Sequence, residues 1–320
     1  MNIKQFIPLS WKRAFRRIKP KPELSQVSIR QRIKRFEVFY KAKTGQELNL
    51  ETPELFTEKL QWYKFFYEHP DFTRIVDKAL FKKYLAEKIG AEYVVPSIAT
   101  WCSLEEVSIK DIDHKKFVLK SNLQGDGTFV RIVKDKDKLD IEKLEEEIKT
   151  KWFDSRRLLS NSYCRAYYGT EPKVIVEKFV DEFTDIDSES VSDYKLYCFN
   201  GDPEFFYIAE EHFIDGELSD MSVITFFDLE WNQMNVKYGD HELNPQARKP
   251  KYLNEMIKIA KQLSAEFPFV RVDFFDTEDK LYVSELTFYP GGGFTPYYPK
   301  SFDKYMGDLL DLTKINKTCT

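Results

Sequence analysis

Two acidic side chains near the carboxyl end of the chain have a spacing that suits divalent-cation chemistry. Asp273 lies in the apolar run VRVDFF, and Glu285 lies in the run LYVSELT that follows a short polar turn. Side chains two apart on a strand share a face, so we expect Arg271 beside Asp273. Thr287 should likewise lie beside Glu285 on the adjacent strand. Such carboxylates could bind Mg²⁺ against a nucleoside triphosphate, although a surface hairpin with solvated acids would have the same spacing.

A lysine followed by a glycine loop could contact phosphates. Lys120 ends the apolar run FVLK, and the loop after it contains Gly125, Asp126 and Gly127. Glycines let backbone amides approach phosphate oxygens, and the lysine supplies a positive charge. A glycine hairpin turn would look the same, and Asp126 places a negative charge where phosphates are expected.

Two further runs could face a nucleotide. VIVEKFV is an apolar strand broken by Glu177 and Lys178, and its edge could offer backbone groups to an adenine. SDYKLYCFNG places Asp193, Lys195 and Tyr197 on one face, where the lysine could meet phosphates. A plain buried strand and an exposed sheet face remain alternatives for these two runs.

The rest of the pattern predicts the elements that must position these groups. Strands and helices alternate without repeats, which favours an α/β or α+β fold with a mainly antiparallel sheet. The predicted helices are 27–43, 57–68, 71–89, 141–152 and 250–267. Besides the two strands of the acidic hairpin, the predicted strands are 93–101, 117–120, 173–180, 192–200, 205–209 and 223–228.

Composition restricts the class of protein and its compartment. A chain of 320 residues with 42% hydrophobic content can bury a full core, as two domains or one elaborated domain. The four cysteines and four histidines are dispersed, which argues against a zinc or redox motif. No stretch suits a signal peptide or a transmembrane helix, so we expect a cytoplasmic protein.

The basic charge is concentrated in the first 45 residues. This segment has 13 Lys or Arg against 2 acids, so the remaining chain carries 36 basic and 51 acidic residues. Aromatic and aliphatic residues interleave with the basic ones, a composition that suits peripheral contact with an anionic membrane surface. A solvated arm packed on the acidic body and a nucleic-acid arm are alternatives, although nothing downstream resembles a nucleic-acid reading domain.

The order of these motifs resembles that of the ATP-grasp superfamily, as in the D-alanine:D-alanine ligases. Asp77-Lys78 with Lys82 comes first, then the lysine–glycine loop, then VIVEKFV, and finally RVDFF with ELT and PGG, over roughly 71–311. Closer still is a similarity to the teichuronopeptide-biosynthesis type of ATP-grasp protein, found with bacterial surface polysaccharide genes. That similarity rests on FTEKLQWYKFFYEHPDFTRIVDK, DYKLYCFNGDPEF, FFDLEW and the segment from FVRVDFF to FDKYMGDLL.

The resemblance implies an ATP-grasp fold, in which two α+β lobes surround a nucleotide cleft. The segment before Asp77 reads as helices rather than the βαβ domain usual in this superfamily, which makes it a helical N-terminal extension. The acceptor pocket therefore cannot be transferred from the relatives. The expected division is 1–50 as a basic arm and helix, 51–116 as a helical and strand region, 117–190 as the small lobe and 191–320 as the central lobe with the metal site.

The resemblance also assigns nucleotide-binding roles to individual residues. Lys78 and Lys120 match the lysines that contact the α- and β-phosphates, and residues 125–127 match the flexible phosphate cover. Glu177 matches the hinge acid that accepts the adenine amino group. The hinge whose backbone faces the base is matched by Lys178, Phe179 and Val180.

Metal-binding and catalytic roles follow from the same resemblance. Asp273 and Glu285 match the magnesium ligands, and Arg271 matches the arginine that steadies the transferred phosphoryl group. Lys195 lies where related ligases carry a phosphate-facing cation. Thr287 replaces the asparagine of the D-alanine ligases, so ligation there is by a hydroxyl, through water, or absent.

The implied activity is that of an ATP-dependent, ADP-forming carboxylate–amine ligase. It would join an amino acid to a sugar carboxylate or amino sugar of a capsule, teichuronic-type polymer or lipopolysaccharide, with ATP and Mg²⁺ and without nucleic acid. A glycosyltransferase that uses an acidic pair such as Asp185 and Asp187 is one alternative. A non-catalytic nucleotide- or glycan-binding protein is another, which the intact lysines and carboxylates disfavour.

Overall fold

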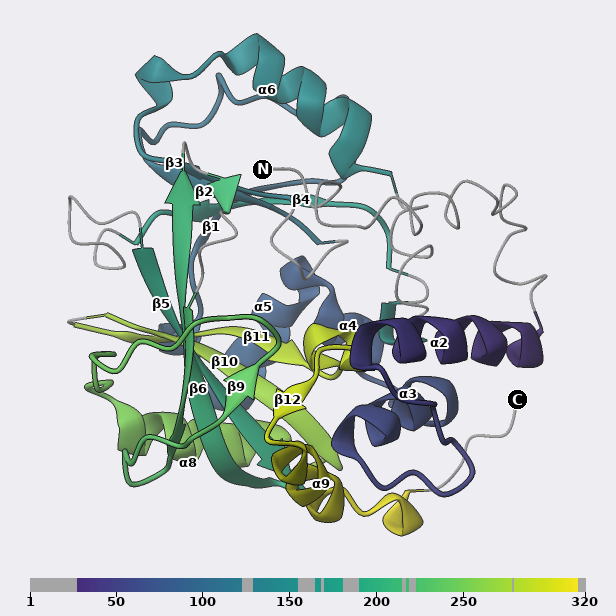
Figure 1. Cartoon of the computed structure of the whole chain (residues 1–320). Coiled ribbons are helices and arrows are strands. Elements are labelled where there is room, and N and C mark those ends of the chain that lie inside the picture. Colours follow the sequence, from purple (N-terminus) through teal and green to yellow (C-terminus); the bar gives the residue numbers. More distant parts are fainter. Residues whose placement is uncertain are drawn as a thin grey trace. The chain divides into compact units, whose positions relative to one another are not determined.

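The computed structural model describes most of the chain (Figure 1). The chain divides into two compact units, Met1–Leu48 and Asn49–Thr320. No helix among the described residues is long and apolar enough to cross a membrane. The described residues are 28–122, 129–154, 165–167, 170–180, 190–214, 217–218, 223–277 and 279–315.

The described part of the first unit is the helix α2 (Ile29–Thr44) with its caps. Ser28 and Gln31 form a capping box that satisfies amides at the helix start. Gly45 ends the helix in the left-handed conformation, with φ of 73°, and donates its amide to the carbonyl of Lys41. The sequence pattern therefore located this helix within two residues at each end.

A four-stranded antiparallel sheet carries the glycine-loop lysine and the predicted hinge. Its strand order is β1-β4-β2-β3. The helix α6 (Ile141–Glu147) and a π turn at Ile148–Trp152 cover one face, where Leu144, Ile148 and Trp152 pack into the sheet's apolar cluster. The strands are β1 (Ser97–Trp101), β2 (Phe117–Ser121), β3 (Val130–Val133) and β4 (Val174–Lys178).

A second, larger antiparallel sheet carries the acidic hairpin. Its strand order is β11-β10-β5-β6-β7, and β8 also pairs with β6. The strand β10 therefore lies between two neighbours, which explains why most of the run FVRVDFFD is buried. The strands are β5 (Ser190–Phe199), β6 (Asp202–Ile214), β7 (Glu217–Leu218), β8 (Val223–Asp228), β10 (Phe269–Asp276) and β11 (Leu281–Thr287).

Helices cover both faces of this larger sheet. On one face, Met256, Ile259 and Leu263 of α8 (Leu253–Ser264) pack with alternate apolar residues of β10 and β5. On the other face, α3 (Phe56–Phe66) and α9 (Lys300–Leu309) pack against an aromatic cluster. The remaining elements are α4 (Phe72–Val76), α5 (Lys78–Ile89), and the paired strands β9 (Lys237–Tyr238) and β12 (Tyr297–Tyr298).

The observed elements match the mixed α+β expectation, with local differences. The predicted helix 71–89 is two helices, α4 and α5, because Asp77 ends the first in an extended conformation and caps the second. The predicted strand 93–101 is shorter, since a 3₁₀ turn at Ala91–Tyr93 precedes β1. The predicted strand 205–209 extends to Asp202–Ile214, because it pairs on both sides with β5 and β8.

Gly307 provides a test of the α3–α9 packing. A Cβ atom at this position would lie 2.0 Å from the carbonyl oxygen of Glu54, so the helix can approach that backbone only without a side chain. Alanine normally stabilises a helix interior relative to glycine. We expect Gly307→Ala instead to lower the free energy of unfolding by about 1–3 kcal/mol, measured by urea denaturation. The control Ser301→Ala, at an exposed position of α9, should have little effect; a stabilised Gly307→Ala would contradict this packing.

Candidate functional site

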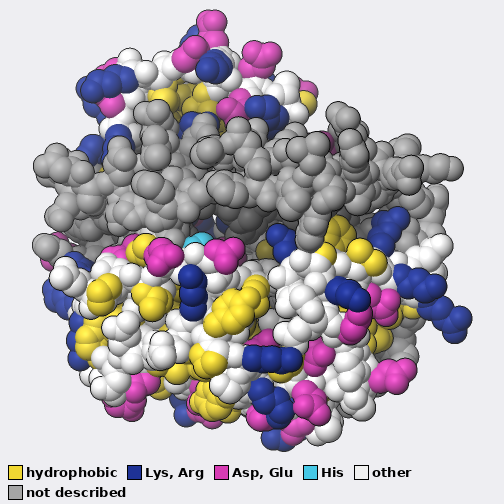
Figure 2. Space-filling model, viewed as in Figure 1, with side chains coloured by type: hydrophobic (Ala, Val, Ile, Leu, Met, Phe, Trp, Pro, Cys, Tyr) yellow, Lys and Arg dark blue, Asp and Glu magenta, His cyan; other side chains and the backbone are white. Residues whose placement is uncertain are grey.

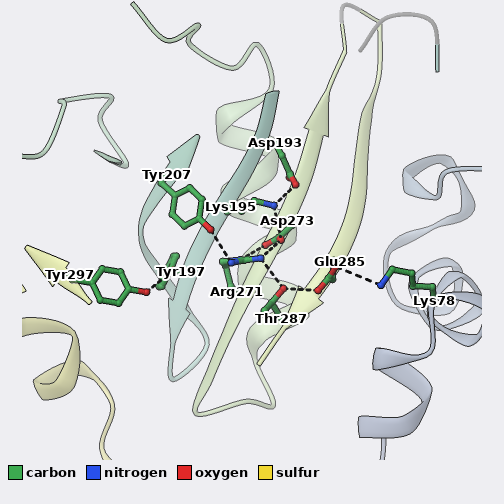
Figure 3. A network of polar contacts seen from close by, with 10 residues as sticks. All are labelled: Lys78, Asp193, Lys195, Tyr197, Tyr207, Arg271, Asp273, Glu285, Thr287 and Tyr297. Atoms are coloured by element: carbon green, nitrogen blue, oxygen red, sulfur yellow. Dashed lines mark hydrogen bonds and ion pairs between the residues drawn. The ribbon is translucent and has the colours of Figure 1, made fainter. Parts of the chain in front are cut away.

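The centre of the candidate site is an arginine–aspartate pair buried on β10 (Figure 3). Arg271 holds Asp273 with two hydrogen bonds, from Nε to Oδ1 at 2.7 Å and from Nη2 to Oδ2 at 2.5 Å. The Nζ atom of Lys195 lies 3.2 Å from the same Oδ2. Only 1% of Asp273 is exposed, so both of its neighbouring cations act on a carboxylate that water hardly reaches.

Strand register explains how these groups meet. Asp273 pairs with Lys195 of β5 on one side and with Glu285 of β11 on the other. Arg271, two residues earlier on the same face, pairs with Tyr197 and with Thr287. The three strands therefore place two rows of polar side chains next to each other. The sequence predicted the β10–β11 half of this arrangement, and the structure adds β5.

Hydrogen bonds extend the pair toward the helix α5. Arg271 donates from Nη2 to the hydroxyl of Thr287 at 3.0 Å, and Thr287 donates in turn to Glu285 at 3.0 Å. The Nζ atom of Lys78, the first residue of α5, lies 4.0 Å from Glu285. On the other side, Arg271 donates from Nη1 to the hydroxyl of Tyr207 at 3.0 Å. Thr287 thus links the arginine to the second carboxylate.

Opposite charges compensate one another inside this site. Lys195 also pairs with Asp193, which shares its strand face, so two cations meet two buried carboxylates. Burial disfavours the charge of Arg271, but Asp273 outweighs this effect and raises the pKa of the guanidinium well above its usual value. Buried charges persist only when they are paired in this way. The guanidinium of Arg271 therefore keeps its charge although it is buried.

The donor set fits a magnesium ion that is shared with a substrate. Asp273 and Glu285 are paired neighbours on the adjacent strands β10 and β11, and Thr287 adds a hydroxyl. Mg²⁺ commonly takes one or two carboxylates together with phosphate oxygens and water. Within the described part of the chain no group of three or more His, Cys, Asp or Glu could hold a metal by itself. Such a site would therefore take its remaining ligands from phosphate and water.

A second charged cluster centres on Glu177 of β4. Its Oε1 lies 2.6 Å from Nζ of Lys82 on α5, and its Oε2 lies 2.7 Å from Nζ of Lys120 on β2. Lys82 also donates to the carbonyl of Val95. Three elements thus bring one buried carboxylate and two lysines together. Lys82 belongs to the motif noted in the sequence, but nothing local predicted that it would pair with Glu177.

The pKa values of this cluster show which interactions dominate. Burial alone would raise the pKa of Glu177, but Lys120 and Lys82 outweigh it and lower the pKa to about 2. Burial lowers the pKa of Lys82 despite its ion pair. The pKa of Lys120 is raised, because the attraction of Glu177, Asp193 and Glu285 exceeds the effect of its burial. Acids of both clusters therefore stabilise the positive charge of Lys120.

A direct contact also joins the two sheets. The Nζ atom of Lys120 lies 5.7 Å from the centre of the Phe275 ring on β10, a distance at which a cation is attracted to an aromatic face. The lysine of the small sheet is thus close to the strand that carries Arg271 and Asp273. Lys78, on α5, reaches the same site from another element.

The remaining predicted residues belong to the hinge 178–180 and to two loops expected from the sequence. In the predicted hinge, Lys178 is exposed, while Phe179 and Val180 are buried. The backbone amide of Lys178 donates to the carbonyl of Pro96. Several predicted positions lie outside the described residues, namely Gly125, Asp126, Gly127, Asp185 and Asp187.

The sequence assigned no site role to two residues that contact the site, Tyr207 and Asp193, although it placed Asp193 on the face of Lys195. Tyr207 pairs with Lys195 across β5 and β6 and binds Arg271. Asp193 pairs with Lys195, and its position two residues earlier was the one local signal, since it puts both side chains on one face. Tyr207 carried no such signal because strand pairing alone brings it near.

Lys120 of the smaller antiparallel sheet and Lys78 of α5 thus lie near the acids of the larger antiparallel sheet. The sequence matches the family model described as TupA-like ATPgrasp over residues 58–311. The chain belongs to this family, and the predicted family and fold are thereby confirmed. No curated protein matches the chain.

Solved structures with partial similarity include three ligases. D-alanine–D-alanine ligase from Bacillus anthracis is 17% identical, with 67% of this chain and 57% of that chain covered and a TM-score of 0.39. D-alanine–D-alanine ligase from Helicobacter pylori is 15% identical, with 75% of this chain and 61% of that chain covered and a TM-score of 0.38. The ATP-grasp ligase PsnB with its minimal precursor is 12% identical, with 69% of this chain and 55% of that chain covered and a TM-score of 0.36. The chain thus spans less than two thirds of the length of each of these proteins.

Removal of the Glu177 charge should produce a pH-dependent loss of stability. The folded pKa of about 2 lies below the ordinary value of 4.5, so the ion pairs stabilise the fold fully above about pH 4.5. This contribution is lost as the pH falls toward 2. We expect Glu177→Gln to lower the free energy of unfolding at pH 7 by about 3 kcal/mol. At pH 3 the variant and the wild type should differ less in their free energy of unfolding, as measured by urea denaturation.

The control for this experiment is Glu242→Gln. Glu242 is an exposed acid whose ion pair with Lys237 spans 3.8 Å, and such pairs contribute little. Its effect should be small at both pH values. A Glu177→Gln difference that stays constant between pH 7 and pH 3 would contradict the assigned ion pairs.

Proposed function

We propose that this protein is an ATP-dependent, ADP-forming carboxylate–amine ligase. The observation that carries the proposal is the convergence of basic side chains on a pair of facing carboxylates, Asp273 and Glu285, within an ATP-grasp chain. Phosphoryl transfer requires alignment and neutralisation of charge more than covalent chemistry from the protein. A network of preorganised cations and acids meets this requirement.

Lysines of different elements are the proposed contacts of the ATP phosphates. Lys78 begins α5 and Lys120 lies near the end of β2, and both ammonium groups are close to the carboxylate cluster. The glycine loop 125–127 is proposed to cover the phosphates. Glu177 is proposed to accept the adenine amino group beside the hinge 178–180, and its lowered pKa keeps it ionised as an acceptor.

Asp273, Glu285 and Thr287 are the proposed magnesium ligands, with Thr287 acting through its hydroxyl or a water. The ion would supply charge neutralisation to the phosphates when it is bound. Arg271, held between Asp273 and Tyr207, is proposed to steady the transferred phosphoryl group. Lys195 is proposed to face the same phosphates. Both oxygens of Asp273 are held by Arg271 and Lys195 in this structure, so binding of the ion and the phosphates would replace some of these contacts.

The reaction follows from the chemistry of carboxylates, which are poor acyl donors. A substrate carboxylate oxygen attacks the γ-phosphorus of ATP, the bond to the β-phosphate oxygen breaks, and ADP leaves. The product is an acyl phosphate. An amine nitrogen then attacks the acyl carbon, the carbon–oxygen bond to phosphate breaks, and the amine loses a proton. Exclusion of water protects the acyl phosphate, for which we propose closure of the lobe around 117–190.

The proposed substrates are an amino acid and a sugar carboxylate or amino sugar of a bacterial surface polysaccharide. This substrate class rests on the TupA-like family and on its similarity to teichuronopeptide-biosynthesis proteins. The proposed lobes are 117–190 and 191–320, after a region at 51–116. The strand β1 comes from that earlier region and pairs with β4, so both segments contribute to the smaller sheet.

A phosphate-release screen should identify the substrates and test the metal ligands. We expect ATP- and Mg²⁺-dependent phosphate release when amino acids are crossed with uronic-acid and amino-sugar acceptors. Asp273→Asn and Glu285→Gln should each reduce the rate by at least about a hundredfold, because each removes a carboxylate charge that would hold the metal ion against the phosphates. Glu242→Gln should retain the wild-type rate, since that acid is exposed and belongs to neither charged cluster.

Thermal unfolding should accompany the screen, because Asp273→Asn leaves Arg271 and Lys195 buried with less compensation. Glu285 is more exposed than Asp273, so we expect Glu285→Gln to disturb folding less. A loss of activity in this variant can then be attributed to the site rather than to unfolding. Full activity of both folded variants would contradict the metal assignment. Release of nucleoside diphosphate from a sugar donor without ATP would favour a glycosyltransferase, and ATP binding without turnover would favour a binding protein.

We propose that the protein acts in the cytoplasm and contacts the inner membrane surface through its basic N-terminal segment. In α2 the residues Arg30, Lys34 and Lys41 are exposed and recur at helical spacing. On the face that Figure 2 draws, basic and acidic side chains are interspersed over the described surface. The basic residues that gather in the first 45 positions supply the positive charge for this proposed contact.

Vesicle sedimentation should test this contact with the full chain. We expect binding to vesicles that contain phosphatidylglycerol, weaker binding at high salt, and no binding to phosphatidylcholine alone. Arg30→Glu with Lys34→Glu should weaken binding by about tenfold or more, at roughly 1 kcal/mol per charge near the surface. The control, Lys115→Glu with Lys138→Glu, reverses two exposed charges elsewhere. Equal loss in both double variants would contradict a specific role of α2.

A further inference from the structure

Asp77 lies at the junction of α4 and α5 and is almost fully buried. Its Oδ1 atom accepts hydrogen bonds from the backbone amides of Ala79 at 2.9 Å and Leu80 at 3.2 Å. These contacts make Asp77 the N-cap of α5. They also occupy two of the amides at the helix start that could otherwise face a phosphate.

The second oxygen of Asp77 reaches the smaller sheet. Its Oδ2 atom lies 2.7 Å from Nζ of Lys173 and 3.2 Å from Nδ2 of Asn122. Asn122 is fully buried, and its Oδ1 accepts the backbone amide of Lys173 at 2.7 Å. The backbone amide of Asn122 donates to the carbonyl of Lys173 at 3.0 Å. Asn122 and Lys173 are thus joined to each other as well as to Asp77.

The two partners of Asp77 lie beside strands that carry proposed nucleotide-binding residues. Asn122 follows β2, which carries Lys120, and it precedes the glycine loop. Lys173 precedes β4, which carries Glu177. Asp77 itself caps α5, which carries the lysines that contact Glu285 and Glu177. One carboxylate therefore connects the three elements on which these charged groups lie.

We propose that Asp77 is a positioning residue for the nucleotide site, acting through its junction with Asn122 and Lys173. The inference rests on the proposed ATP-dependent activity. The junction keeps the lysines of α5 in register with Lys120 and Glu177. Because Oδ1 already accepts from the amides of Ala79 and Leu80, the side chain of Lys78 is the proposed phosphate contact of this helix.

The two oxygens of Asp77 allow the junction to be separated from the helix cap. In Asp77→Asn the side-chain oxygen can still accept from Ala79 and Leu80, and asparagine is as good an N-cap as aspartate. The side-chain amide nitrogen introduced at this position would then face the nitrogen donors of Lys173 and Asn122. An amide nitrogen cannot accept a hydrogen bond from them. Lys173→Met breaks the ion pair from the other side, at a residue that is partly exposed.

The test is calorimetric binding of ATP with Mg²⁺ to the full chain. We expect Asp77→Asn and Lys173→Met each to weaken binding by roughly tenfold, the usual range for loss of a coupled buried pair. The double variant should bind about as weakly as either single variant, because both remove the same junction. Asp140→Asn is the matched control, since Asp140 caps α6 without a comparable junction, and it should leave affinity unchanged.

Hydrogen exchange without nucleotide separates this inference from the proposed activity. Amides at the start of α5 and at the start of β4 should exchange faster together in Asp77→Asn and in Lys173→Met, but not in Asp140→Asn. If the wild-type chain binds no ATP, the proposed function fails while the exchange result still decides on the junction. The inference is overturned if a folded Asp77→Asn variant binds ATP with wild-type affinity, or if the losses of ATP affinity in the two single variants multiply in the double variant. Unchanged exchange of the amides at the starts of α5 and β4 would also overturn it.

Discussion

The interaction on which the site depends is the ion pair of Arg271 and Asp273 inside the larger sheet. A buried charge is costly unless opposite charges and hydrogen bonds compensate it. Here the compensation comes from strands on both sides of β10: Lys195 on β5, Tyr207 on β6 and Thr287 on β11. The strand order is therefore as important to the site as the residues themselves.

Aromatic packing sets the surroundings of this pair. Tyr197, Tyr207 and Tyr297 are buried near Arg271, and the hydroxyls of Tyr197 and Tyr297 lie 2.9 Å apart. Phe56 of α3 packs against several rings of the same cluster. Such apolar surroundings limit access of water, which strengthens electrostatic interactions. The helices on this face thus influence the site without contributing to its charge.

The Glu177 cluster applies the same principle in the smaller sheet. Its carboxylate is buried between two lysines from different elements, and Lys120 also experiences the acids of the larger sheet. The acids of the larger sheet therefore help to keep a lysine of the smaller sheet charged. The Asp77 junction connects the start of α5 to the smaller sheet through side-chain contacts with Asn122 and Lys173.

The sequence by itself determined many of the elements and the acidic hairpin, because alternation of apolar residues is local and turn residues mark where strands end. Motif order also determined the family. Only the tertiary structure decided that β5 lies beside β10, that Glu177 lies between Lys82 and Lys120, and that Asp77 reaches Asn122 and Lys173. These contacts join residues up to 96 positions apart. They depend on strand order and buried charge, which no local pattern specifies.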